Sequence, residues 1–503
     1  MKKIFISLFA IPFLLFATFP AQVNAENEST LPEEIIYDIL VDRFNNGSQA
    51  PSDQVDIHDP FTYNGGDIQG VTMKLDSLQE FGITVVSLSP IMENAKKGYH
   101  GYWIEDFYSV EEEFGTMDDL KELVEEAHKK DMKVILEFVT NYVAKTSPIV
   151  DDADKQDWFL ENEIEPIDST QWLDDVYVLD QHNQNVEDYL IDVALYWMDE
   201  VDIDGFKLHA ADQSSPTFLK NLTQEIKEKD PNFYVLATTL QGNEDVADVL
   251  QIDTIDAVAN EKLSTELNHV FTKADEPVSK LFDYKEREKG YRDLLFVDNI
   301  NTARFSNNFA DNGRNAVTTW TLALAYMYLT PGVPIIYQGS EVPMYGPGYP
   351  ENQYIVDFTS ADPDLEKVFD RLASLRDQFP VLVYGDIEQI AVDGGLSLFK
   401  RTLDDKSIYV AINNDSESRV VTISGIDSDL QLKGLLHDDT IRGNENGEFL
   451  IGMERESAEV FIIQPNVGFN WGFIGFVAGV FIVFVGAIVL LSRKQKKRQL
   501  AEK

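Results

Sequence analysis

The chain has 503 residues, of which 87 are acidic, 41 are basic and none is cysteine. The formal net charge of −46 gives a surface that repels nucleic acid and anionic lipid, so we expect no nucleic-acid partner. Without cysteine no disulfide can stabilise the fold, so the hydrophobic core must do so. The length suits one large domain with a smaller one beside it.

The first 25 residues have the composition of a secretory signal. The basic pair Lys2-Lys3 precedes an apolar run over residues 4–19, and small residues follow up to Ala25. A basic start, an apolar centre and a small residue at the cleavage point are the three parts of such a signal. We therefore predict a signal peptide over residues 1–25, with an uncleaved N-terminal membrane anchor as the alternative.

Residues 26–380 alternate short β-branched or aliphatic runs with longer helical patterns. One such helix is expected at Met117–Lys130, where Leu120, Leu123, Val124 and Ala127 share a face. Eight strand–helix repeats over about 350 residues predict an α/β fold, a (β/α)8 TIM barrel with its helices outside. The expected strands are Ile35–Leu40, Thr84–Leu88, Lys133–Val139, Gly205–Leu208, Tyr234–Ala237, Ala257–Ala259, Leu294–Val297 and Val333–Tyr337.

Two further parts interrupt or follow the barrel pattern. The longest gap between strands, about residues 142–189, is rich in Asp, Pro and Trp and predicts a subdomain inserted after strand 3. After Phe379 the pattern changes to short alternating runs, which predict a C-terminal antiparallel β-sandwich domain over residues 381–466. Its expected strands include Leu396–Lys400, Ser407–Asn413, Arg419–Ser424 and Ser457–Ile463.

The end of the chain has the pattern of a membrane anchor. Trp471–Leu491 is an uncharged stretch long enough to cross a bilayer, and it predicts a transmembrane helix over residues 467–492. The basic segment 493–503 follows at once, and clustered Lys and Arg mark the cytoplasmic side. A cleaved surface-sorting signal is the main alternative, but no LPxTG-like motif precedes the stretch. We expect a cell-membrane protein with a single span, an extracellular ectodomain and a cytoplasmic tail.

Several motifs of the barrel region occur in the order and spacing of one known family. Together they give a resemblance to the α-amylase family, glycoside hydrolase family 13, that covers about residues 34–465. The family has a barrel, an insertion after strand 3 and a C-terminal β domain. The motifs are Ile36–Phe44, Gly65–Gly70, Gly98–Trp103 with Asp106–Tyr108, Phe114–Leu120 and Lys133–Asn141.

The resemblance also implies where the family's chemistry should lie. A retaining glycosidase needs a nucleophilic carboxylate and an acid carboxyl about 5–5.5 Å apart, at the carboxyl ends of barrel strands. The nucleophile, the acid and a third carboxylate of the family fall on His209, Thr238 and Asn301 of this chain. Threonine cannot donate a proton near neutral pH, and asparagine carries no charge to stabilise an oxocarbenium ion. We expect the loss to remove most activity, because acid and nucleophile each contribute several powers of ten.

Other family positions around the same site are also changed. The histidine that closes the strand-3 motif is Tyr142, and an Asp and an Arg after strand 8 correspond to Tyr349 and Gln353. The resemblance leaves a set of candidate substrate-binding residues, which are His100, Tyr102, Trp103, Tyr142 and Lys207. Tyr142, Ile300 and Tyr349 are large enough to fill the space of a sugar instead.

Calcium is the one cofactor that the resemblance suggests. Near the N-terminus, the oxygen-bearing residues Asn46, Ser48, Asp53, Gly65 and Asp67 lie where some relatives hold Ca²⁺. A central site of the family would use Asn141, but its aspartate partner corresponds to Val178. The alternative for all of these residues is an ordinary hydrated acidic surface.

Three functions are compatible with these observations. The first is a membrane-anchored, catalytically inactive amylase homologue that binds an α-glucan or wall polysaccharide, or a membrane protein partner. The second is a working α-glucan hydrolase or transglycosidase with an unusual active site. The third is a structural surface protein without a ligand. Glucan turnover separates the second from the others, and glucan affinity without turnover separates sugar binding from protein binding.

Overall fold

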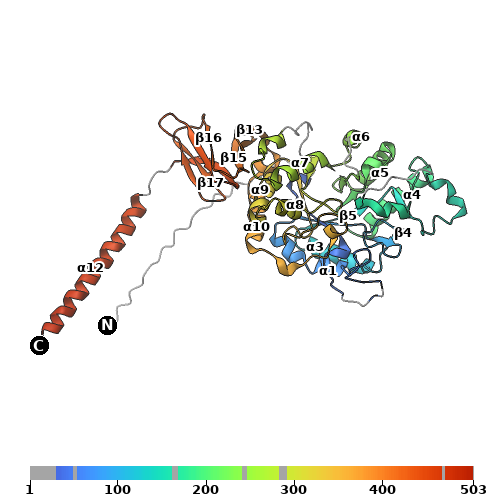
Figure 1. The fold of residues 1–503 in the computed structure, drawn as a ribbon, viewed down its shortest axis with the longest axis horizontal. Helices are drawn as coiled ribbons and strands as arrows, with labels where there is room; N and C mark the ends of the chain where they lie inside the picture. Colours follow the sequence, from blue (N-terminus) through green and yellow to red (C-terminus); the bar gives the residue numbers. More distant parts are fainter. Residues whose placement is uncertain are drawn as a thin grey trace, which may run out of the picture.

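The computed structural model describes residues 30–48, 52, 54–160, 168–240, 246–282, 292–466 and 471–501. The predicted signal peptide lies outside these residues. Figure 1 shows the barrel, the C-terminal β domain and a long terminal helix in chain order.

Eight parallel strands close a barrel in the order β1-β12-β11-β10-β9-β8-β5-β2, which confirms the predicted fold. Strands that pair in the barrel are therefore consecutive barrel strands along the chain, and the first and last, β1 and β12, pair to close it. All eight predicted strands are present, although β11 ends at Leu295, two residues before the predicted end. The strands are β1 (Ile36–Ile39), β2 (Val85–Leu88), β5 (Lys133–Phe138), β8 (Gly205–Leu208), β9 (Tyr234–Ala237), β10 (Ala257–Ala259), β11 (Asp293–Leu295) and β12 (Val333–Tyr337).

Helices cover the outside of this barrel. The predicted helix forms as α3 (Met117–His128), where the Thr116 side chain and Asp119 make a reciprocal capping box at its start. Its four predicted apolar residues are buried. The other helices are α1 (Ile68–Thr72), α2 (Leu75–Glu80), α4 (Gln184–Glu200), α5 (Pro216–Lys229), α6 (Val246–Leu250), α7 (Glu261–Thr272), α8 (Phe305–Asp311), α9 (Ala316–Leu329), α10 (Pro363–Gln378) and α11 (Pro380–Tyr384).

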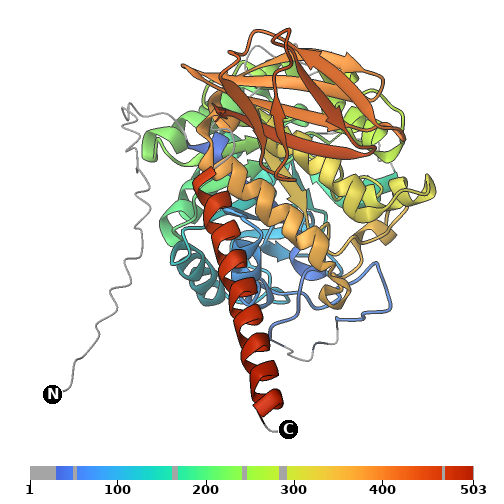
Figure 2. The same cartoon turned by 90° about the vertical axis from the view of Figure 1, so that its left-hand side faces the viewer.

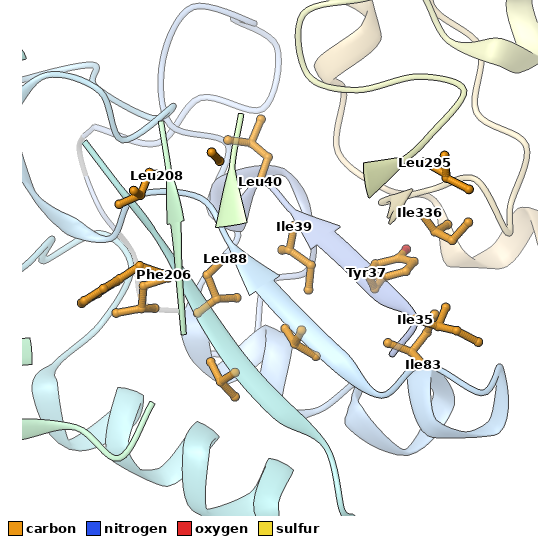
Figure 3. Packing of buried hydrophobic residues seen from close by; sticks show 14 of the residues in the cluster. Ile35, Tyr37, Ile39, Leu40, Ile83, Leu88, Phe206, Leu208, Leu295 and Ile336 are labelled. Carbon is orange, nitrogen blue, oxygen red and sulfur yellow. The ribbon is translucent and has the colours of Figure 1, made fainter. Parts of the chain in front are cut away.

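Because successive side chains of a strand point to opposite faces, the barrel strands contribute to two hydrophobic clusters. Ile36, Val85 and Ile135 belong to a cluster that also takes residues from β9, β10, β11 and β12, as expected for side chains inside the barrel. Tyr37 and Ile39, which alternate with Ile36 on β1, belong instead to the large cluster shared with the helices. Figure 3 shows part of that second cluster around β1 and β2.

The insertion after the third barrel strand is small and loop-rich. β6 (Tyr142–Ala144) pairs antiparallel with β7 (Val176–Val178). The 3-10 helices η3 (Ala153–Trp158) and η4 (Asp168–Asp175) lie between these strands. A second short sheet, β3 (Met92–Asn94) with β4 (Ile104–Val110), follows barrel strand β2.

The C-terminal domain has two antiparallel sheets. One has six strands in the order β13-β14-β15-β20-β17-β18, and the other pairs β16 with β19. Side chains from both sheets share one core, as in a sandwich. The strands are β13 (Asp386–Asp393), β14 (Leu396–Leu403), β15 (Lys406–Asn413), β16 (Arg419–Ile423), β17 (Leu430–Gly434), β18 (Thr440–Arg442), β19 (Phe449–Met453) and β20 (Ser457–Pro465).

A buried arginine joins this domain to the barrel. Arg401 on β14 donates to the carbonyl oxygen of Leu329, at the end of α9, at 2.5 Å. It also donates to the carbonyls of Leu382 at 2.5 Å and Gly385 at 2.7 Å. Because the guanidinium is buried, these carbonyls replace the water that a cation normally keeps. The bonds fix the first strands of the sandwich against the last helices of the barrel.

The chain ends in helix α12 (Trp471–Ala501). Residues Gly475–Arg493 have a mean hydropathy of 2.6 and none of the segment is buried, so the helix is long and apolar enough to cross a membrane. Figures 1 and 2 show α12 as a single helix at the end of the chain. The basic segment 493–503, which we predicted as a separate tail, begins inside this helix.

Candidate functional site

A polar layer closes the carboxyl end of the barrel interior. On β1, β2 and β5, each apolar residue of the interior cluster is followed two positions later by a polar residue. The period of two in a strand places these polar side chains on the same inner face, one step nearer the mouth. The polar layer consists of Asp38, Ser87, Glu137 and, from β8, Lys207.

Lys207 is the centre of this layer. Its ammonium contacts Asp38 Oδ1 and lies 3.1 Å from Glu137 Oε2. Asp38 Oδ1 also accepts a hydrogen bond of 2.8 Å from Ser87 Oγ. The Lys207 and Glu137 side chains are only 5% and 7% exposed, so these charges interact away from water. One cation therefore compensates two carboxylates inside the barrel.

The pKa values of this pair follow from the same contacts. Burial by itself raises the pKa of Glu137, but Lys207 and His209 outweigh burial and lower the pKa to about 2. Burial likewise lowers the pKa of Lys207, and the charges of Asp38 and Glu137 more than reverse that effect. Glu137 therefore stays ionised at neutral pH and cannot serve as a general acid.

His209, at the family's nucleophile position, is tied to the polar layer. Its Nδ1 lies 2.7 Å from Glu137 Oε1, and its backbone N–H donates to the Phe138 carbonyl at 3.0 Å. Tyr102 donates to the same Glu137 oxygen at 3.2 Å. Nε2 of His209 is buried and has no hydrogen-bond partner among the described residues. The Glu137 carboxylate thus orients the imidazole through Nδ1, and no described group that could donate a proton bonds to Nε2.

Aromatic side chains cover His209. We call His100, Tyr102, Tyr142 and Trp172 the aromatic cover. Tyr102 lies with its ring centroid 4.5 Å from Trp172 and 4.5 Å from His209, and Trp172 lies 5.8 Å from His209. Tyr142 contacts both Trp172 and His209, at 5.6 and 6.0 Å. All four side chains are buried, with at most 5% of each exposed.

The predicted substrate-binding residues therefore pack on one another. His100, Tyr102, Tyr142 and Lys207 are buried, and Trp103 Nε1 donates to the Trp172 carbonyl at 2.8 Å. Burial, followed by the charge of Arg43, lowers the pKa of His100 to about 3, so that imidazole is neutral at physiological pH. Their role in sugar binding remains a prediction, and a sugar could reach them only if the aromatic cover moved.

The two other family acid positions make ordinary structural bonds. Thr238 Oγ1 donates to the Leu208 carbonyl at 3.2 Å, between neighbouring strands β9 and β8. Asn301 lies in the loop after β11, where its N–H donates to Asn299 Oδ1 at 2.9 Å. Neither group can carry the charge or the proton that the family's reaction requires.

Nearby carboxylates also have structural partners. Asp298 is buried and accepts a 2.7 Å bond from the Phe305 N–H at the start of α8. Burial raises the pKa of Asp298, and Arg304 partly opposes this. Asp212 is half-buried and accepts from the Leu240 N–H at 2.8 Å.

Tyr349 and Gln353, the two family positions after strand 8, also contact other parts of the protein. Gln353 is buried, accepts from Tyr99 Oη at 2.9 Å and donates to the Ile300 carbonyl at 3.0 Å. Tyr349 makes an edge contact with Phe61 at 5.9 Å. The amide and the aromatic ring thus hold loops together where the family has sugar-contacting charges.

The central calcium position does not fit a metal ion. Asn141 Oδ1, the oxygen that would bind Ca²⁺, accepts hydrogen bonds of 2.8 Å from both Gln181 Nε2 and Ser214 Oγ. The Asn141 amide nitrogen donates to the carbonyls of His209 and Ala210. Gln181 and Ser214 therefore use the acceptor capacity that a cation would need.

The predicted N-terminal calcium set is only partly described. Asp67 accepts backbone N–H bonds from Gly47, Ser48 and Gly70, at 2.6 to 2.9 Å. Asn46 and Gly65 line the same pocket, whereas Asp53 lies outside the described residues. Within the described residues no group of three or more His, Cys, Asp or Glu side chains is placed to hold a metal. Asp67 organises this loop, and calcium binding remains a prediction.

Asp38, Ser87, Glu137 and Trp172 belong to the site but were not predicted from the sequence as site residues. Asp38 could have been found, because it follows the interior residue Ile36 by two positions on a strand that was recognised. Trp172 could not, because it comes from the insertion and reaches Trp103 across 69 residues. No local pattern indicates which aromatic residue of a loop will close a distant site.

A further carboxyl lies beside the barrel axis. Glu261, the first residue of α7, accepts a 3.4 Å bond from Thr239 Oγ1. Burial raises its pKa, Thr239 lowers it and Asp212 raises it, with a net value of about 7. Glu261 is thus partly protonated near neutral pH.

The fold and the site together define the class of protein. An eight-stranded barrel with an insertion after its third strand, a C-terminal β domain and a site at the strand ends is the architecture of amylase-type glycoside hydrolases. The alpha-amylase catalytic-domain family matches residues 38–380, and the alpha-amylase C-terminal domain matches residues 385–461. The chain therefore belongs to the α-amylase family, which confirms the resemblance.

Known relatives agree with this assignment. A Beta/alpha-amylase of Paenibacillus polymyxa is 29% identical over 85% of this chain, but the match spans only 38% of that larger protein. A cyclomaltodextrinase of Thermoanaerobacter pseudethanolicus is 27% identical over 78% of this chain and 72% of its own length.

Solved structures show the same relation. An Anoxybacillus alpha-amylase has a TM-score of 0.83 and 38% identity, covering 88% of this chain and all of that chain. An alpha-amylase from Geobacillus thermoleovorans, solved with acarbose, has a TM-score of 0.81 and 36% identity with the same coverage.

The central cation can be tested by its contribution to stability. We expect Lys207→Met to lower the free energy of unfolding by about 3–5 kcal/mol, because two buried carboxylates lose their compensating charge. Lys121→Met is the control, since its ion pair with Glu200 is 43% and 46% exposed and should contribute less than about 1 kcal/mol. Urea unfolding measures both, and equal losses would contradict the central role of Lys207.

The raised pKa of Glu261 predicts a pH-dependent stability. Below the ordinary glutamate value of 4.5 the carboxyl is protonated in both states and contributes nothing. As pH rises from 4.5 towards 7, the unfolded chain releases its proton first, so folding is progressively destabilised. Glu261→Gln should therefore raise the melting temperature at pH 8 and not at pH 4.

Scanning calorimetry at the two pH values checks this expectation. The exposed Glu225→Gln on α5 is a matched control, which should leave the melting temperature unchanged at both. An equal gain from Glu261→Gln at pH 4 and pH 8 would show that ionisation of this carboxyl is not the cause.

Proposed function

We propose that this chain is a membrane-anchored protein of the α-amylase family that binds an α-glucan or wall polysaccharide without hydrolysing it. The observation that carries the proposal is the state of His209. It occupies the nucleophile position, is bonded to an ionised Glu137 and is buried under the aromatic cover. The acid position holds Thr238, whose hydroxyl is bonded to a strand carbonyl.

Glucan is favoured over a protein partner by the similarity to starch-acting enzymes. The relatives are an amylase and a cyclomaltodextrinase, and one similar amylase structure holds acarbose. A membrane protein partner is the second candidate, and it would be indicated by a lack of affinity for any glucan. Calcium at the N-terminal loop, around Asp67, also remains part of the proposal.

The activity test uses purified full-length protein with starch, maltooligosaccharides, cyclodextrin, pullulan and trehalose. We expect no released sugar over a day, but retention of the protein on insoluble starch. A His209→Ala, Thr238→Ala double variant controls for contaminating amylase. Product formed by the native protein and not by the double variant would establish an unusual active site instead.

The anchoring proposal rests on α12, whose apolar segment ends at Arg493. A positively charged flank of this kind favours a cytoplasmic tail, which supports the proposal of an extracellular barrel. A chain ending at Asn466 should leave the membrane fraction and become soluble, whereas a chain ending at Arg493 should stay in it. Carbonate extraction followed by immunoblotting measures both, and a chain ending at Asn466 that stays membrane-bound would contradict the proposal.

A further inference from the structure

A second concave site lies beside the closed barrel axis. It has a volume of about 510 Å³ and lies between α7, the segment that follows β11, and α8. We call it the α7–α8 pocket. Its volume is within the range of small-molecule sites, about 300–1,000 Å³. The residues that matter here are Glu261, Ser264, Thr265, Asn268, Phe296 and Asn308.

The amide groups in the pocket wall are held in fixed orientations. Asn268 Nδ2 donates to the Val297 carbonyl at 3.0 Å, and Asn268 Oδ1 accepts from Asn308 Nδ2 at 3.1 Å. Asn312 in turn donates to the Asn308 carbonyl at 2.8 Å. Side chains that are fixed before a ligand arrives lose little conformational entropy on binding it.

Ser264 has an unusual environment in this wall. Its side chain is buried, with 5% exposed, and among the described residues its hydroxyl has no hydrogen-bond partner. A buried hydroxyl without a partner costs about 1–3 kcal/mol. Rotation about one bond would turn this hydroxyl towards a ligand in the pocket, which would then supply the missing partner.

The pocket suits an uncharged polyhydroxylated ligand. Amide and hydroxyl groups of Ser264, Thr265, Asn268 and Asn308 both donate and accept hydrogen bonds, as sugar hydroxyls do. Phe296 adds an apolar wall for the C–H face of a ring. Among the lining residues, Lys273 opposes the negative charges of Asp311 and Glu261, so the pocket offers no positive field for an anion.

Glu261 connects this pocket to the former active site. Its carboxyl also lines the pocket, and Thr239, which bonds to it at 3.4 Å, follows directly after Thr238. A carboxylate with two oxygens can accept from two neighbouring sugar hydroxyls. The pocket is therefore linked through Glu261 and Thr239 to the neighbouring Thr238, and no residue of the aromatic cover lines it.

We infer that the α7–α8 pocket binds a sugar residue of an uncharged glucan, in place of the closed site on the barrel axis. The inference rests on the proposed glucan binding and names where that binding occurs. It does not require the aromatic cover to move.

The test is calorimetric titration of the full-length protein in detergent with maltotriose. Thr265 is exposed and lines the pocket, so Thr265→Trp should block it without disturbing the core. We expect at least a tenfold loss of affinity, equivalent to about 1.4 kcal/mol. Lys262→Trp, an exposed neighbour on α7 outside the pocket lining, is the matched control and should bind like the native protein.

Two further variants separate the possible outcomes. Glu261→Gln keeps the size of the side chain and should weaken maltotriose binding, whereas Tyr142→Phe alters only the aromatic cover and should not. Native-like binding by Thr265→Trp, with weaker binding by Tyr142→Phe, would place the sugar on the barrel axis and overturn the inference while glucan binding stands. Native protein that binds neither maltotriose nor starch would overturn the proposed function, and this inference with it.

Discussion

The buried ammonium of Lys207 is the interaction on which the site depends. It compensates Asp38 and Glu137 in an interior where an unpaired charge would cost several kcal/mol. Glu137 in turn positions His209 and Tyr102, and these two rings support Trp172. A chain of contacts thus runs from one cation on β8 to the residue that closes the barrel mouth. Removal of Lys207 would leave Asp38 and Glu137 without their cation, whereas Trp172 contacts Tyr102 and His209 only through their rings.

The same contacts fix the charge of the carboxylate beside His209. A retaining mechanism needs one carboxyl that can be protonated and one that is free to attack. Here the carboxylate nearest the nucleophile position, Glu137, is bound to a cation and a histidine, and its pKa is about 2. His209 and Thr238 instead bond to neighbouring strands. These residues therefore contribute to the stability of the barrel. A catalytic group that must stay free for the substrate contributes less to stability.

The α7–α8 pocket is separate from this layer of charges. The fixed amides of Asn268 and Asn308 and the carboxyl of Glu261 lie outside the polar layer and do not take part in its ion pairs. Binding there needs no proton transfer and no distortion of a sugar ring.

The barrel, the C-terminal sandwich and the apolar terminal helix could all be predicted from the sequence alone. These follow from patterns of period two and from motifs a few residues long, which local sequence contains in full. Only the tertiary structure decided that Lys207 pairs with Asp38 across 169 residues, that Gln181 satisfies Asn141, and that Trp172 covers His209. Such contacts join segments far apart in the chain, and their partners are selected by packing and by the need to compensate buried charge.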